Sequence, residues 1–202
     1  MPNPATKETV GVDVDDVLVP HAEELIRLYN QKYGTRLTLA DNHNLDPRAW
    51  GVNEITEAVK RVQAITHTPE FIEMEPYEDA LTSLRVLSTT YEIAVITARD
   101  TVIEQASRDW LNKHFSEIVR QAHFTARYNL EGKYRSKAEI VKTIGAICLI
   151  DDAPENALQV AEIGVDVLLF GDYPWNQKQP MPANVTRVSN WQEVLEYFDG
   201  RN

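Results

Sequence analysis

Short apolar runs alternate along the chain with longer segments in which apolar residues recur every three or four positions. Four runs have the length and composition of strands that are buried on both faces, as in a parallel sheet covered by helices. The runs are TVGVDV ending near Asp13, YEIAVIT ending near Thr97, AICLID ending near Asp151 and VDVLLF ending near Phe170. This alternation predicts an α/β fold with a doubly wound, Rossmann-like parallel sheet.

Helix signals stand between and after these strands. Thr101–Glu104 and Ser136–Glu139 have the form of capping boxes, and Gly164 stands where a helix should stop. The predicted helices span about 77–88, 101–113, 136–144, 154–163 and 189–197.

The crossover from the first strand to the second needs only one helix, and the helix at 77–88 already supplies it. Residues 20–75 are therefore additional to the crossover. Two amphipathic patterns, at 22–33 and 55–65, flank a polar stretch. We therefore expect a helical cap inserted at 20–75 into a core domain of residues 1–19 and 76–202. The cap would emerge at the carboxyl end of the first strand, where such sheets bind ligands, with hinges near Pro20 and Pro76.

Charge and composition exclude some classes of binding partner. The net charge of −11 argues against long DNA or RNA, whose binding depends on neutralising phosphates. No run approaches ~18 apolar residues, no leader pattern opens the chain, and Cys148 is the single cysteine, so we expect a cytoplasmic protein without a membrane partner. The oligomeric state stays open, a homodimer included.

Acidic residues gather where the predicted strands end. Asp13 and Asp15 follow the first strand, and Asp151 and Asp152 end the third. Because the carboxyl ends of parallel strands share one edge, these side chains should converge there. Buried carboxylates need a compensating cation, and hard oxygen ligands suit Mg²⁺ together with a substrate phosphate. The sequence predicts a site for Mg²⁺ and a small phosphate ester.

These positions resemble the four motifs of the haloacid dehalogenase (HAD) superfamily of phosphatases, in the family's order and over nearly the whole chain. The motifs are Asp13-Val14-Asp15, Thr97 in VITAR, Lys137 in RSKAEIV and Asp151-Asp152 in CLIDDAPEN. One departure is Asp16, where many relatives have glycine.

The resemblance implies an aspartyl-phosphate mechanism. Asp13 would attack phosphorus, and Asp15 would protonate the leaving alcohol and then activate water. The phosphate would be held by Thr97, Ala98 and Lys137, and the metal by Asp13, Asp15 (through its carbonyl oxygen), Asp151 and Asp152.

Within the superfamily, the insertion together with LIDDAPENA and FGDYPWN resembles the 5'(3')-deoxyribonucleotidase group. That narrower likeness implies a nucleoside or deoxynucleoside monophosphate as substrate. Candidate substrate contacts are Arg99, Trp50, Phe71 and Tyr173, the three aromatic residues by stacking.

Other interpretations stay open at single residues. Asp152 could cap the next helix, Lys133 could replace Lys137 at the phosphate, and Arg99 could pair with Asp100 or Glu104. Trp50 could belong to the insertion's own core, and Tyr173 to a packed loop.

For the whole protein, the alternatives are a phosphotransferase or phosphomutase on the same scaffold and a non-catalytic binder of phosphorylated metabolites. A signalling receiver also carries an acidic pair, a threonine and a lysine, but it lacks such an insertion.

Overall fold

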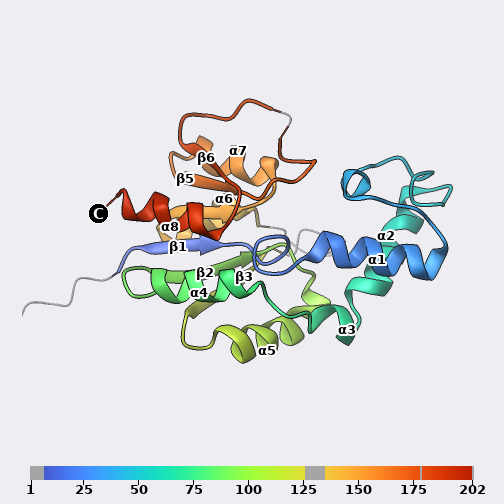
Figure 1. Cartoon of the computed structure of the whole chain (residues 1–202), viewed down its shortest axis with the longest axis horizontal. Helices are drawn as coiled ribbons and strands as arrows, with labels where there is room; N and C mark the ends of the chain where they lie inside the picture. The colour runs from blue at the N-terminus through green and yellow to red at the C-terminus, as the bar shows by residue number, and fades with distance from the viewer. Residues whose placement is uncertain (1–6, 126–134, 178, 202) are drawn as a thin grey trace, which may run out of the picture.

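A computed structural model describes residues 7–125, 135–177 and 179–201. One parallel sheet of six strands forms the centre, in the order β3-β2-β1-β4-β5-β6 (Figure 1). The strands are β1 Thr9–Val12, β2 Glu92–Thr97, β3 Val119–Phe124, β4 Ala146–Asp151, β5 Asp166–Phe170 and β6 Val185–Val188. The predicted α/β fold with a parallel sheet is confirmed.

The two strands that the pattern did not predict, β3 and β6, are the sheet edges. Their sequences, VRQAHF and VTRV, contain exposed polar residues because an edge strand is covered less completely. The four predicted strands are the inner ones, and each consists mostly of buried residues.

Helices cover both faces of the sheet. One apolar cluster joins it to α4 (Glu78–Leu87), α5 (Glu104–Phe115) and α8 (Trp191–Asp199). The other joins it to α6 (Lys137–Ile144) and α7 (Pro154–Glu162). The chain crosses to the other half of the sheet after β3, so β1 and β4 lie side by side at the switch point, where open α/β sheets bind ligands.

Residues 20–75 contain α1 (His21–Tyr33), η1 (Leu39–Asp41), α2 (Ile55–Thr66) and α3 (Pro69–Ile72). They share an apolar cluster of their own, in which Tyr29 and Trp50 are buried. In Figure 1, α1 and α2 lie beyond the carboxyl end of β1. We call these residues the 20–75 segment.

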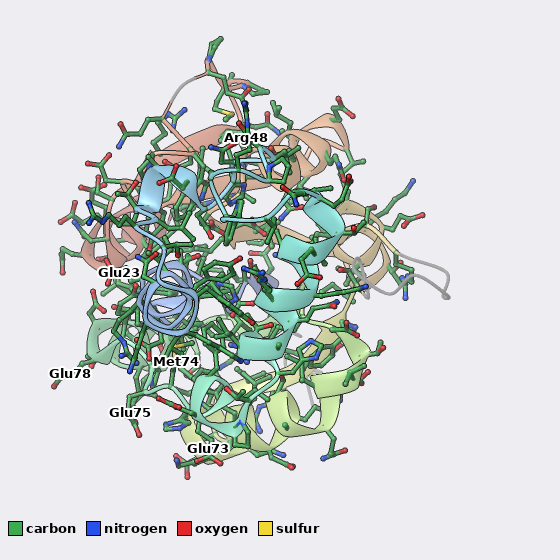
Figure 2. All side chains as sticks on the ribbon, turned by 90° about the vertical axis from the view of Figure 1, so that its right-hand side faces the viewer. Glu23, Arg48, Glu73, Met74, Glu75 and Glu78 are labelled. Atoms are coloured by element: carbon green, nitrogen blue, oxygen red, sulfur yellow. The ribbon has the colours of Figure 1, made fainter. Side chains whose placement is uncertain are left out.

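The two ends of the 20–75 segment lie close together. The Tyr77 amide, just after it, donates to the Leu18 carbonyl at 2.8 Å, just before it. Figure 2 looks onto this side of the molecule and shows the exit at the periphery, where Glu73 and Glu75 point outwards. Both glutamates are exposed, so the connection to α4 runs over the surface.

One of the two predicted capping boxes is confirmed and the other is wrong. Ser136 and Glu139 form the predicted capping box of α6. The box predicted at Thr101–Glu104 is wrong, because the Asp100 carboxylate instead accepts from the Val102 amide and caps a 3-10 turn at Thr101–Ile103. Helix α5 begins only after that turn, at Glu104.

No helix within the described ranges is both long and apolar enough to cross a membrane.

Candidate functional site

Three buried carboxylates meet where β1 and β4 end. Asp13 directly follows β1, and its amide donates to the Ile150 carbonyl of β4 at 2.9 Å. Asp151 ends β4, and Asp152 follows it. One carboxylate oxygen from each of Asp13, Asp151 and Asp152 lies within 4.8 Å of the others, so the switch point gathers acids from distant parts of the sequence.

Lys137 is the cation of this cluster. Its Nζ lies 2.7 Å from Oδ2 of Asp13 and 2.7 Å from Oδ2 of Asp151, and its side chain is 2% exposed. The Ser136 capping box fixes it as the first residue of α6. Burial alone would lower the lysine pKa, but Asp13 and Asp151 outweigh burial and raise it, so the amine is charged.

Among the described residues, one lysine pairs with the three acids, which leaves them with excess negative charge. Oδ1 of Asp13 is buried and has no hydrogen-bond partner among the described residues. Burial raises the pKa of Asp13 to about 7 against the opposing effect of Lys137. Burial, and next the charge of Asp151, raise the pKa of Asp152 well above its usual range. An orphaned carboxylate oxygen among hard oxygen donors fits a divalent cation such as Mg²⁺.

Asp15 forms its ion pair with Arg99. Arg99 donates to its Oδ1 from Nη2 at 2.8 Å and from Nε at 3.0 Å. Burial raises the pKa of Asp15, but Arg99, helped by His21, reverses this and lowers it below the usual range. The ion pair that the sequence suggested for Arg99, with Asp100 or Glu104, is therefore wrong, and Glu104 pairs with Arg108 at 2.8 Å instead.

Thr97 reaches the same sheet edge from β2. It ends that strand, which pairs with β1 through Val95 and Val12, and it is fully buried. Its hydroxyl accepts from the Arg99 amide at 3.2 Å. Ala98, between them, is partly exposed. Thr97 and Ala98 thus stand beside the strand that delivers Asp13.

Two residues that the sequence analysis missed hold the acidic pair. Asn156 donates from Nδ2 to Oδ1 of Asp151 at 3.0 Å, and Trp175 donates from Nε1 to Oδ2 of Asp152 at 2.8 Å. Asn156 lies one helical turn beyond the acidic pair, a spacing that could have indicated it. Asp152 does not cap α7, because Ala153 occupies the N-cap position.

The aromatic candidates lie in two places. Trp50 and Phe71 are 5% and 2% exposed inside the cluster of the 20–75 segment, which is the alternative that the sequence left open for Trp50. Tyr173 is partly buried in the loop after β5, which is the packed loop that the sequence left open, and its hydroxyl donates to the Asp16 carbonyl at 2.8 Å. Lys133 lies outside the described residues.

Asp16 connects the site to the 20–75 segment. Its φ of +59° is the left-handed conformation that glycine adopts most easily, so a glycine would fit here without strain. Its Oδ1 accepts from the Ala22 amide at 2.8 Å, in the first turn of α1. Burial raises the pKa of this carboxyl to about 8. The N-cap residue of α1, Pro20, makes no side-chain bond to the helix, and the Asp16 carboxylate instead accepts from an amide of its first turn.

Comparison with known families gives one match over almost the whole chain. Residues 7–199 match the model of the family described as 5' nucleotidase, deoxy (pyrimidine), cytosolic type C protein. Among curated proteins, "Putative nucleotidase BH1399" of Halalkalibacterium halodurans is 26% identical over 196 residues, which cover 94% of this chain and 91% of that protein.

Solved structures of HAD hydrolases share the fold. The HAD-like hydrolase SP0104 from Streptococcus pneumoniae has a TM-score of 0.68 at 16% identity, covering 95% of this chain and 98% of that one. A protein from Clostridium acetobutylicum described as "a predicted phosphatase" has a TM-score of 0.68 at 14% identity, covering 97% of this chain and 100% of that one. The "putative HAD-hydrolase YfnB" from Bacillus subtilis, solved with magnesium bound, has a TM-score of 0.61 at 10% identity, covering 96% of this chain and 99% of that one.

Proposed function

Because the chain belongs to the 5' nucleotidase, deoxy (pyrimidine), cytosolic type C family and is thus an HAD-type phosphoric monoester hydrolase, we propose a mechanism and a substrate class for it. The proposed activity is the Mg²⁺-dependent hydrolysis of a nucleoside or deoxynucleoside monophosphate through an aspartyl phosphate. The proposed location is the cytoplasm.

The observation that carries this proposal is the surplus of buried acid around Asp13. Oδ2 of Asp13 is taken by Lys137, whereas Oδ1 is buried without a partner among the described residues. A buried, unpaired carboxylate oxygen is costly unless a cation or a reacting group occupies the space beside it. Asp13 is accordingly the proposed nucleophile.

The proposed reaction has two steps. A carboxylate oxygen of Asp13 attacks phosphorus, the bond from phosphorus to the ester oxygen breaks, and a proton passes from Asp15 to the leaving oxygen. Water, giving its proton to Asp15, then attacks phosphorus and releases phosphate and Asp13. Thr97, Ala98 and Lys137 would hold the phosphate oxygens.

Asp15 has to be protonated to act first as an acid. In the structure Arg99 favours its ionised form. A phosphate dianion bound beside Asp15 would raise its pKa, because a like charge nearby disfavours ionisation. Substrate binding would in this way help to load the proton that the leaving group needs.

The proposed metal ligands are the oxygens of Asp13 and Asp151 and the carbonyl of Asp15, with Asp152 as ligand or support. When bound, Mg²⁺ would neutralise the charge that develops on the transferring phosphoryl group. The magnesium in the related fold of YfnB supports this choice of ion.

The 20–75 segment is the proposed cap, inserted into a core domain of residues 1–19 and 76–202. Its separate apolar cluster and its place beyond β1 support this division. With Trp50 and Phe71 buried, the base would meet the exposed side chains of the segment and the loop that carries Tyr173. The proposed hinges are the chain near Pro20 and Pro76.

A substrate panel tests the proposal. Nucleoside and deoxynucleoside monophosphates and sugar phosphates are assayed for released phosphate, with and without Mg²⁺, on the wild type and on Asp13→Asn. We expect nucleotides to be preferred and the variant to be inactive but folded. Products carrying phosphate on an added alcohol would indicate a phosphotransferase, and no turnover on any substrate would indicate a non-catalytic binder.

A further inference from the structure

The loop that follows β5, residues 171–176, is built to hold one conformation. Gly171 has φ +82°, and a Cβ placed there would lie 2.1 Å from the ring of Tyr173. Only glycine lets the tyrosine ring fold back over the backbone in this way. The hydroxyl of Tyr173 then reaches the Asp16 carbonyl, so the loop is tied to the turn that follows the proposed nucleophile.

Asn176 fastens the other end of the loop. Its side chain is buried, and Nδ2 donates to the carbonyls of Phe170 at 2.8 Å and Gly171 at 3.0 Å. Arg187 of β6 donates to the Asn176 carbonyl. A loop held by so many backbone contacts presents the side chain between its two anchors in a defined place.

That side chain is Trp175, and it makes two kinds of contact. Its Nε1 donates to Oδ2 of Asp152 at 2.8 Å. Its ring stacks on Tyr173, with centroids 4.6 Å apart and planes 2° apart. It also stacks on His43, with centroids 5.0 Å apart and planes 17° apart.

The contacts with Asp152 and His43 join Trp175 to different parts of the molecule. Asp152 is 7% exposed in the acidic cluster, whereas His43 is an exposed residue of the 20–75 segment, just after η1. An indole N–H can only donate, so it holds a carboxylate oxygen in one orientation and leaves the second oxygen to turn toward a cation. Residues that orient metal ligands in this way strongly affect metal affinity.

We propose that Trp175 is a positioning residue that links the 20–75 segment to the metal site: its N–H fixes Oδ2 of Asp152, and its ring receives His43. This inference rests on the proposed function, because it needs a metal at the acidic cluster. It assigns a role to the FGDYPWN motif, which the reaction itself does not use.

Calorimetric titration of the full chain with Mg²⁺, without substrate, tests the first contact. Trp175→Phe keeps an aromatic ring and removes the donor, and we expect it to raise the Kd for Mg²⁺ by about tenfold or more. Trp191→Phe is the matched control, because the Trp191 indole donates to the backbone carbonyl of Val17 at 3.2 Å and not to a carboxylate. The control should keep the wild-type Kd.

His43→Ala tests the second contact. It leaves the N–H donor in place and removes only the stacking partner, so we expect a smaller rise in Kd, about threefold. Excess Mg²⁺ should restore the kcat of Trp175→Phe, since the metal can draw Asp152 into position; a merely structural lesion would not respond.

The outcomes separate this proposal from the proposed function. A wild type that binds no Mg²⁺ overturns both. A wild type that binds Mg²⁺ while folded Trp175→Phe binds it equally well overturns the role of the N–H alone. An unchanged Kd in His43→Ala overturns the link to the segment. Melting curves establish that each variant is folded.

Discussion

Arg99 donates two hydrogen bonds to one carboxylate oxygen of Asp15, from Nη2 at 2.8 Å and from Nε at 3.0 Å. The arginine is itself held from behind by Ser107, at 3.4 Å from Nη1, and by the face of Trp110, 5.8 Å from the guanidinium carbon. It is 7% exposed. The proposed acid and base of the reaction is thereby fixed in place and kept ionised.

Arg99→Met should move the pH profile of the reaction. Removing the guanidinium raises the pKa of Asp15, because Arg99 is the group that lowers it most. With para-nitrophenyl phosphate, whose leaving group needs no proton, kcat requires ionised Asp15 only for the attack of water. We expect the acidic limb of kcat against pH to shift upward by about one unit.

Arg99→Lys is the control, since it keeps the charge and loses the forked geometry, and its limb should shift less. A raised KM with an unmoved limb in Arg99→Met would show that Arg99 binds substrate and does not tune Asp15.

Asp13→Asn should change how the stability of the metal-free protein depends on pH. The folded-state pKa of Asp13 is about 7 against 3.8 for the ordinary group, so between these values the folded protein holds a proton that the unfolded chain has released. The stability that this bound proton contributes to the folded protein is therefore complete at low pH and is lost as the pH rises toward 7. The variant lacks this loss and should gain on the order of 4 kcal/mol relative to wild type between pH 4 and 8.

Urea unfolding in chelator, at a series of pH values, measures this difference. A constant difference between wild type and Asp13→Asn across the range would contradict the raised pKa. Adding Mg²⁺ should stabilise the wild type more at pH 8 than at pH 5, because the metal competes with protons for the carboxylates.

Substitutions at Asp16 should separate its hydrogen bond to α1 from its backbone conformation. Asp16→Ala loses the bond to the Ala22 amide and keeps a positive φ that alanine disfavours, so unfolding should become easier by about 1–2 kcal/mol. Asp16→Gly loses the same bond but suits the φ, so it should be destabilised less than Asp16→Ala. Urea unfolding in the presence of Mg²⁺ measures both. A glycine variant less stable than the alanine variant would refute the role of φ.

The sequence predicts the part of the fold that burial controls. The four inner strands are apolar on both faces and therefore stand out, and their ends place Asp13, Thr97 and Asp151 at one edge. The Ser136 box is equally visible, because capping depends on neighbouring residues only. Local pattern and sheet geometry thus suffice to gather the acids and Lys137.

Contacts between distant residues escape such reasoning. Nothing near Arg99 in the sequence distinguishes Asp15, 84 positions away, from the adjacent Asp100 as its partner. Trp175 likewise reaches Asp152 across 23 positions. The edge strands were missed for a different reason, since half-exposed strands such as VRQAHF carry no continuous apolar run.

Trapping the covalent intermediate tests the central claim, that Asp13 is the nucleophile, most directly. Asp15→Asn lacks the base for the second step, so a single turnover of para-nitrophenyl phosphate with Mg²⁺, quenched in acid, should leave one phosphoryl group on the peptide that contains Asp13. Peptide mass spectrometry detects it, and the Asp13→Asn, Asp15→Asn double variant should show none. Release of nitrophenol with no phosphoryl group on Asp13, or with the group on another residue, would contradict the account.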